Sequence, residues 1–256
     1  MRFSKWHALG NTYVLVERAD LRGPLNAELA HRLCDVHYGI GSDGVLEVVT
    51  VSGAEAEIVI WNPDGSVAEF SGNGSRIAAA WLVERVEDVN VTISTAGRAY
   101  PAGVRRDGMV AMALGEVEVG EIETVEIGIE RIELTAVSVG NPHAVVRWIP
   151  ERDELLRLGP QIETSDRFPE RTNVQLVRVD GPHEVTALVW ERGVGETTAS
   201  GSSAVAVASA AVANGWCESP VAVRMPGGEL LVELDDENRP TLVGPAEEIC
   251  NGEVHV

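Results

Sequence analysis

The chain has 256 residues, 45% of them hydrophobic, which is enough apolar material for one large or two smaller cores. Its formal net charge of −20 argues against a nucleic-acid-binding surface, because such surfaces need clustered cations. No apolar run approaches the roughly 20 residues of a membrane span, and the N-terminus lacks a signal-peptide core, so we expect a cytoplasmic protein without membrane contact.

The three cysteines are Cys34, Cys217 and Cys250, and their spacing matches no metal-ligand pattern. We therefore expect reduced structural thiols and no metal site. A strongly acidic protein does not attract an anionic substrate from a distance. Any anion that this chain binds must be held by local groups.

The first half of the chain predicts strands with two helices. The segment WHALGNTYVLVE reads as a strand, a Gly-Asn turn and a strand, and residues 24–37 carry apolar side chains at helical spacing after Pro24. A loop, YGIGSDG, precedes the strands VLEVVTV and EIVIW. A helix is expected over about residues 75–86, followed by short alternating segments with a hairpin turn at residues 106–108.

The pattern restarts near residue 116. The segment TAVSVGNPHAVVRW again predicts strand, turn and strand, followed by a short helix near ERDELLRLG and the strand NVQLVRV. A second Ala/Val-rich helix should stop at Asn214-Gly215, and hairpin-like strands complete the chain. Many short strands with few helices favour an α+β fold.

One sequence pattern occurs twice in the chain. An apolar run ends at Trp61 in the first copy and at Trp190 in the second, and a glycine-containing polar turn follows. Ten positions after each tryptophan stands a Ser-Gly pair, beginning at Ser71 and Ser200, which opens an Ala/Val-rich segment. The repeat predicts two pseudo-equivalent halves, each presenting a serine at the start of a buried helix.

Glycine-rich turns that lead into helices expose backbone N–H groups at the positive end of the helix dipole, which suits a carboxylate or phosphate. Both Ser-Gly segments fit this description. A single Ser-Gly helix start would be an ordinary N-cap, but two copies at matched spacing favour a functional interpretation. If the halves face each other, two helix N-termini could hold one small anion.

The chain resembles the diaminopimelate epimerase family from end to end. Six ordered blocks carry the resemblance: FSKWHALGN (3–11), GIGSDG (39–44), NPDGSVAEFSGNGSR (62–76), SVGNPH (138–143), FPERTN (168–173) and ERGVGE (191–196). It implies two pseudo-symmetric α/β domains, each a curved, largely antiparallel sheet around a central helix, with the active site in the cleft between them. The domains would be 1–116, joined by about 246–256, and 117–245.

The resemblance also implies a reaction. Members of the family interconvert LL- and meso-diaminopimelate without a cofactor, in the synthesis of lysine and peptidoglycan precursors. A cysteine on each face of the α-carbon removes or returns the proton. A homodimer that binds a diamino dicarboxylate is expected, with no nucleic-acid partner.

The resemblance assigns roles to residues by motif. The catalytic positions fall on Ser71 and Ser200, with His143 and Glu191 as supporting residues. The α-carboxylate would meet the two helix N-termini, and the distal amino-acid end would meet Arg192 and the asparagine amides. The substrate-binding positions are Asn11, Asn62, Gly72, Asn73, Gly74, Asn141, Asn173, Glu191, Arg192, Gly201 and Ser202.

The departure from the family is central, because both catalytic cysteines are replaced by serine. A cysteine thiol has a pKa near 8.5, which a helix N-terminus lowers further, whereas a serine hydroxyl needs an adjacent base before it reacts. The family also usually has cysteine where Ile77 and Val205 stand, and GTG at residues 201–203. This wider drift favours a natural serine variant over an engineered one.

Three interpretations remain open from the sequence. The protein could be a diaminopimelate epimerase with a substitute base, for which Glu191, His143, Glu69 and Asp64 are candidates. It could be a related racemase, isomerase or dehydratase with another amino-acid substrate. It could also be a binding paralogue, or a Cys-to-Ser substrate trap, that holds a diamino acid without turnover.

Overall fold

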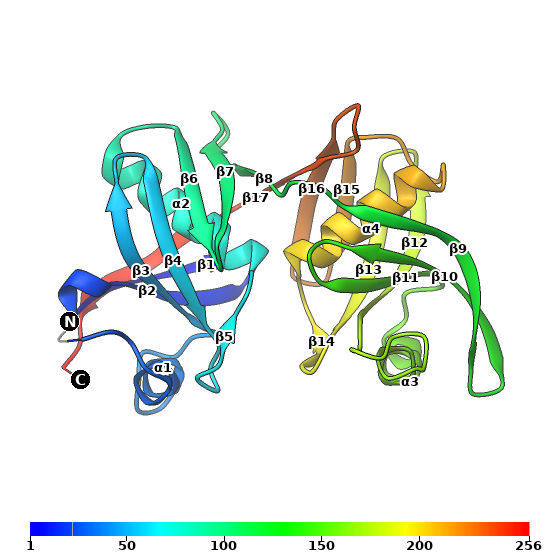
Figure 1. Ribbon diagram of the computed structural model, residues 1–256, viewed down its shortest axis with the longest axis horizontal. Coiled ribbons are helices and arrows are strands. Elements are labelled where there is room, and N and C mark those ends of the chain that lie inside the picture. Colours follow the sequence, from blue (N-terminus) through cyan, green and yellow to red (C-terminus); the bar gives the residue numbers. More distant parts are fainter. Residues whose placement is uncertain (22, 256) are drawn as a thin grey trace. The chain divides into compact units, whose positions relative to one another are not determined.

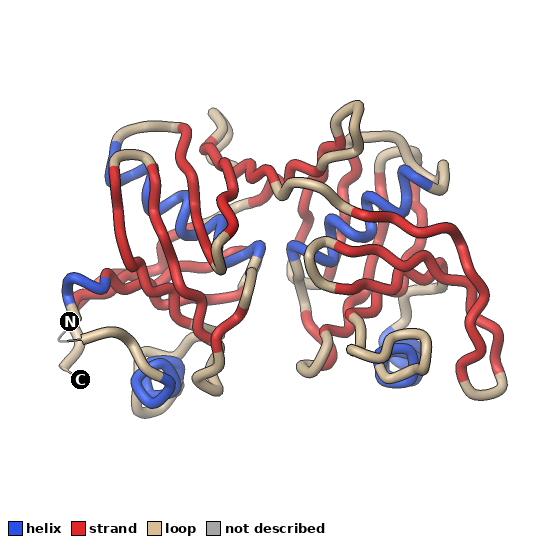
Figure 2. The backbone as a smooth tube through the Cα atoms, in the orientation of Figure 1, coloured by secondary structure: helices blue, strands red, loops and turns tan. Residues whose placement is uncertain are grey.

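The computed structural model describes residues 1–21 and 23–255. The chain divides into two compact units, one formed by Met1–Ala113 with Gly244–Val256 and the other by Leu114–Val243. Figure 2 shows that strands dominate the units.

The first unit contains β1 (Arg2–Ala8), β2 (Asn11–Glu17), a 3-10 turn η1 (Arg18–Asp20), α1 (Ala27–Cys34), β3 (Val45–Ser52), β4 (Glu55–Trp61), β5 (Val67–Ala68), α2 (Gly72–Val86), β6 (Asn90–Thr95), β7 (Arg98–Val104), β8 (Val110–Ala113) and β18 (Glu247–Glu253). The second contains β9 (Glu118–Ile127), β10 (Glu130–Ser138), β11 (Pro142–Arg147), α3 (Arg152–Glu163), β12 (Asn173–Gly181), β13 (Glu184–Glu191), β14 (Gly195–Thr197), α4 (Gly201–Ala213), β15 (Val221–Met225), β16 (Gly228–Leu234) and β17 (Pro240–Gly244).

Both units have the same topology. Strands pair in the order β18-β1-β2-β3-β4-β6-β7-β8 in the first and β9-β10-β11-β12-β13-β15-β16-β17 in the second. Only β2–β3, β4–β6, β11–β12 and β13–β15 are parallel among these pairs. The prediction of an α+β fold with two pseudo-symmetric, largely antiparallel halves is therefore confirmed.

Each sheet packs around one central helix (Figure 1). Helix α2 contacts β1, β2, β4 and β6–β8, and α4 contacts β9–β13, β15 and β16. Ten of the fifteen residues of α2 and ten of the thirteen of α4 are buried. Buried alanines, which are frequent in both helices, let the strands approach closely.

Local capping moves two helix starts away from the predicted positions. Helix α1 begins at Ala27 rather than beside Pro24, because the Asn26 side chain accepts a hydrogen bond from the N–H of Leu29. Val36, expected on the apolar face of this helix, lies beyond its end and is exposed. Helix α2 begins three residues before Ser75, since Ser71 acts as its N-cap.

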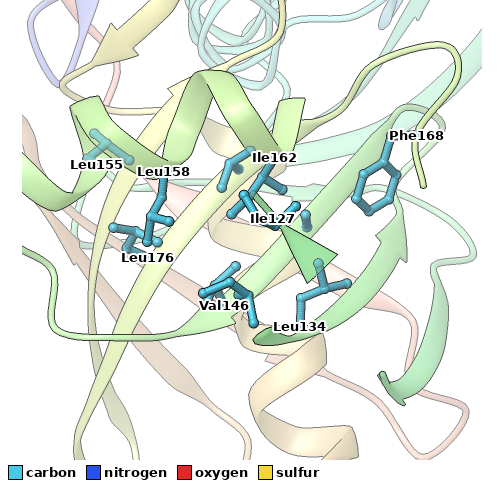
Figure 3. Close-up of a cluster of buried hydrophobic side chains, with 11 residues drawn as sticks. Ile127, Leu134, Val146, Leu155, Leu158, Ile162, Phe168 and Leu176 are labelled. Carbon is cyan, nitrogen blue, oxygen red and sulfur yellow. The ribbon is translucent and has the colours of Figure 1, made fainter. Parts of the chain in front are cut away.

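Helix α3 closes the core of the second unit. Figure 3 shows Leu155, Leu158 and Ile162 of this helix facing side chains of the neighbouring strands. Phe168, in the segment after the helix, belongs to the same buried cluster. This packing fixes the segment that leads into β12, which carries Asn173.

None of the helices within residues 1–21 and 23–255 is both long and apolar enough to cross a membrane.

Removing the buried side chain of Leu158 should destabilise the second unit. We expect Leu158→Ala to lower the free energy of unfolding by about 2–5 kcal/mol, because it leaves a cavity in a fully buried cluster. Urea denaturation followed by tryptophan fluorescence measures this change. Leu156→Ala, on the more exposed side of α3, is the control and should change stability much less. Equal effects would contradict the packing described.

Candidate functional site

Ser71 lies at the N-terminus of the buried helix α2. Its Oγ accepts a hydrogen bond from the N–H of Gly74 at 3.0 Å and lies 3.0 Å from the Tyr13 hydroxyl. A side chain at Gly74 would place its Cβ 3.3 Å from the Ser71 Oγ, so glycine permits this close approach. We call Asn11, Tyr13 and residues 71–74 the N-terminal half-site.

Ser200 occupies the corresponding position at the start of α4, but its surroundings differ. Its side chain makes no capping hydrogen bond with the helix. Instead, its hydroxyl is hydrogen-bonded to the carboxyl of Glu191, the last residue of β13. Burial raises the pKa of Glu191, and this hydrogen bond opposes the rise. We call Asn141, His143, Asn173, Glu191, Arg192 and residues 200–203 the C-terminal half-site.

The strand registers show which residues of the two units correspond. Trp61 pairs with Val45 and Trp190 with Val174, and these valines pair in parallel with Val14 and Ala144. Tyr13 and His143, each one residue earlier, are therefore equivalent. Both stand two residues after an asparagine of a Gly-Asn turn, in GNTY and GNPH.

His143 is fully buried and held as a neutral imidazole. Burial lowers its pKa to about 3, and the positive charge of Arg192 adds to the effect. Its Nε2 lies 2.9 Å from Asn141 Oδ1, and its Nδ1 lies 3.0 Å from the amide nitrogen of Gln175. Nε2–H donating to Asn141 and Nδ1 accepting from Gln175 satisfies both contacts. Both ring nitrogens are thus occupied by protein groups.

Gln175 links this histidine to α4, because its amide nitrogen also donates to the Ser203 hydroxyl at 3.0 Å. Leu46 holds the equivalent position in the first unit, and its Cδ2 would lie 3.0 Å from a Cβ on Gly74. A polar contact in one unit therefore replaces an apolar contact in the other.

The second turn of α2 contains a buried cation. Burial lowers the pKa of Arg76 to about 10, so the guanidinium stays protonated at neutral pH. It donates to the carbonyl of Gly72 at 3.1 Å and to Asn73 Oδ1 at 2.7 Å. The Asn73 amide in turn donates to Asn11 Oδ1 at 3.2 Å. A positive charge and a chain of oriented amides thus support the N-terminal half-site.

Asn173 and Arg192 are joined in the second unit. Asn173 donates to the carbonyl of Pro142 at 2.9 Å and accepts from the backbone N–H of Arg192 at 3.0 Å. The Arg192 side chain is exposed, and its guanidinium lies 3.4 Å from the carbonyl of Glu170. Gly201 is buried and Ser202 half-buried at the start of α4.

The remaining candidates lie in the turn between β4 and β5 or directly after β5. Asn62 donates to the Ser66 hydroxyl at 2.9 Å, so its amide stabilises this turn. Hydrogen bonds from Ser66 hold the pKa of Asp64 below its ordinary value, which makes this carboxylate a weaker base. Glu69 is exposed. Of the four substitute bases considered, only Glu191 is both bonded to a catalytic serine position and raised in pKa.

Sequence reasoning missed Tyr13, Arg76, Gln175 and Ser203. The Gly-Asn-x-aromatic pattern of GNTY and GNPH would have indicated Tyr13. Gln175 and Ser203 become visible only through the hydrogen bond that joins them, and Arg76 only through its burial.

Among the described residues, no group of three His, Cys, Asp or Glu side chains is arranged to hold a metal ion. A surface groove of about 600 Å³ in the second unit is lined by residues that include Arg147, Trp148 and Arg178, and none of its lining residues belongs to the candidate site.

The sequence matches the family model described as diaminopimelate epimerase over residues 3–120 and 135–249. A diaminopimelate epimerase of Pelotomaculum thermopropionicum is 37% identical over 99% of this chain and 98% of its own length. That of Desulforudis audaxviator is 38% identical over 98% of each. A solved structure of a predicted epimerase from Pseudomonas aeruginosa has the same fold, with a TM-score of 0.75, 17% identity and coverage of 100% and 99% of the two chains.

The relatives match the chain over nearly its whole length, and the shared fold accounts for both units. The chain therefore belongs to the diaminopimelate epimerase family.

Proposed function

We propose that this protein is an amino-acid epimerase of the diaminopimelate type in which Ser71 and Ser200 occupy the proton-transfer positions. One observation carries the proposal: both serines start the central helix of a duplicated unit, and each hydroxyl contacts a titratable side chain. A serine that served only as a helix cap would need no such partner. The names of the 33–38% identical relatives support diaminopimelate as the substrate.

The helix N-termini suit the substrate's reacting carboxylate. The first N–H groups of a helix have no partner within it, and the helix dipole favours an anion there. Residues 72–74 and 201–202 would supply these N–H groups, and the buried charge of Arg76 strengthens the first set. Arg192 and the amides of Asn11, Asn62, Asn141 and Asn173 would bind the distal amino-acid end.

Glu191 supplies the base that serine lacks. Its half-buried carboxyl has a raised pKa and is hydrogen-bonded to the Ser200 hydroxyl. When Ser200 takes the α-proton, its own proton can pass to the Glu191 carboxylate, so that no free alkoxide is needed. His143 orients Asn141 and Gln175 rather than carrying a proton, because both of its nitrogens are occupied.

The place of the protein in the cell follows from the proposed reaction. We propose a cytoplasmic enzyme, independent of any cofactor, in the synthesis of lysine and peptidoglycan precursors. The division into an N-terminal and a C-terminal epimerase-like domain and a homodimeric assembly belong to the same proposal.

One observation favours a second function, binding without turnover. Ser71 Oγ accepts the Gly74 N–H as an ordinary helix cap does, and both family thiols are absent. A diamino acid could then be bound and released unchanged. The exchange of the substrate's α-proton with solvent separates this function from epimerisation.

Restoring the two thiols should raise activity. We expect the double variant Ser71→Cys, Ser200→Cys to epimerise diaminopimelate about 100-fold faster than the unmodified protein, because a helix N-terminus stabilises a thiolate. The rate is followed by proton NMR in D₂O, with binding measured by calorimetry. Ser209→Cys, a buried serine nine residues further along α4, is the matched control and should change nothing. A double variant that binds normally but stays inert would contradict the proposed site.

Removing the carboxyl of Glu191 should abolish most of the exchange. We expect Glu191→Gln to lower kcat by about 10²–10⁴-fold. The unmodified protein should lose activity in acid with a midpoint above the ordinary glutamate pKa, since the raised pKa keeps Glu191 protonated to higher pH. The residual activity of the Glu191→Gln variant should not show this loss in acid.

A stability measurement separates the loss of the base from unfolding. Burying a carboxyl whose folded-state pKa is raised costs stability as the pH rises through that pKa, so Glu191→Gln should be at least as stable at pH 7. Glu196→Gln, at the exposed residue of β14, is the control and should retain full activity. Full activity of Glu191→Gln would show that the base lies elsewhere.

A further inference from the structure

The Tyr13 hydroxyl is placed to exchange a proton with Ser71. The two oxygens lie 3.0 Å apart, and Ser71 Oγ accepts the Gly74 N–H at the same distance. A serine hydroxyl has one proton and two acceptor sites, so Ser71 can accept from Gly74 and still share a proton with the phenol. The phenol is thus the titratable partner of this serine.

The ring of Tyr13 packs directly against the backbone of Gly44, which has no side chain to displace it. A Cβ at Gly44 would lie 2.5 Å from Tyr13 Cε1 and 2.7 Å from the carbonyl of Trp61. Tyr13 is only 6% exposed, and it pairs with Trp6 of β1. The strand thus presents the hydroxyl to Ser71 from a fixed ring.

A buried cation lies at the start of α2, which carries Ser71 as its N-cap. In β1, Lys5 and His7 flank Trp6 and therefore point to the opposite face of the sheet from Tyr13. In β3, the Glu47 carboxylate accepts hydrogen bonds from Arg18, Leu25 and Trp61. In α2, Glu84 and Arg85 lie near the far end, about three turns away. Arg76, in the second turn of α2, donates to the Gly72 carbonyl and so places a positive charge at this helix start, while the Asp43 carboxylate accepts from Thr12, beside Tyr13.

The second unit does not repeat the arrangement. His143 holds the place of Tyr13, but its nitrogens bond Asn141 and Gln175, and Ser200 is bonded to Glu191 instead. One serine is paired with a phenol and the other with a carboxyl. A phenol has an ordinary pKa near 10 and a carboxyl an ordinary pKa near 4. At neutral pH a phenol therefore favours its protonated form and a carboxyl its ionised form.

We propose that Tyr13 is the positioning residue that supplies a proton through Ser71; this rests on the proposed epimerase function. As the substrate's α-C–H bond breaks, its proton passes to Ser200 and the Ser200 proton passes to Glu191. The electron pair remains on the α-carbon. Ser71 then donates its proton to that carbon and takes the proton of Tyr13, leaving a phenolate. The reverse reaction starts from this phenolate and the protonated Glu191.

The first experiment tests the pair without turnover. In a Ser71→Cys, Cys250→Ser protein, which lacks the exposed native thiol, the pH dependence of iodoacetamide alkylation at position 71 gives the pKa of the introduced thiol. Adding Tyr13→Phe should raise that pKa by about one unit, because a hydrogen bond to the thiolate is lost. Tyr100→Phe, which removes another buried hydroxyl of the same unit, should not. An unchanged pKa in the Tyr13 variant would overturn the pair.

The second experiment compares α-proton exchange in two backgrounds. With the native serines, Tyr13→Phe should lower kcat at least 100-fold and leave KM within about threefold. With both serines replaced by cysteine, the same change should lower kcat less than about threefold, because a thiolate needs no phenol. Equal losses in the two backgrounds would assign Tyr13 a packing role only and overturn the proposal. No exchange in the unmodified protein would overturn the proposed function. The alkylation result would still show whether Tyr13 is hydrogen-bonded to the side chain at position 71.

Discussion

The start of a helix inside a sheet is the constraint on which this structure depends. The first N–H groups of a helix need partners, and a buried start cannot leave them to water. Gly72 and Gly201, the first residues of α2 and α4, are both buried. In α2 the Ser71 side chain takes one of these N–H groups, whereas in α4 the Ser200 side chain takes none. The unpaired N–H groups that require a cap can also bind an anion.

The two units share one strand topology, and differences at a few equivalent positions make the two half-sites unlike. Equivalent places hold Tyr13 and His143, Gly74 and Ser203, and Leu46 and Gln175. Arg76 has Val205 as its counterpart, so only the first helix has a buried cation in its second turn. An enzyme that inverts a carbon needs an acid on one face and a base on the other. Different partners for the two serines would meet that need.

The sequence predicted the architecture because the architecture is repeated. Trp61 and Trp190 mark the ends of equivalent strands, and the Ala/Val-rich segments after Ser71 and Ser200 form central helices that are buried over most of their length. Capping was harder to predict, because Pro24 and Asn26 compete as the start of α1, and only the Asn26 side chain makes the hydrogen bond. The Tyr13–Ser71 contact joins residues 58 apart, so no local pattern in either segment specifies it.

The measurement that tests this account most directly is proton NMR of the unmodified protein with LL-diaminopimelate in D₂O. The account predicts loss of the α-proton signal together with formation of the meso isomer, because each serine has a titratable partner that can take or supply a proton. A stable α-proton signal, with line broadening that demonstrates binding, would contradict it. The chain would then retain a ligand site of its family without the chemistry.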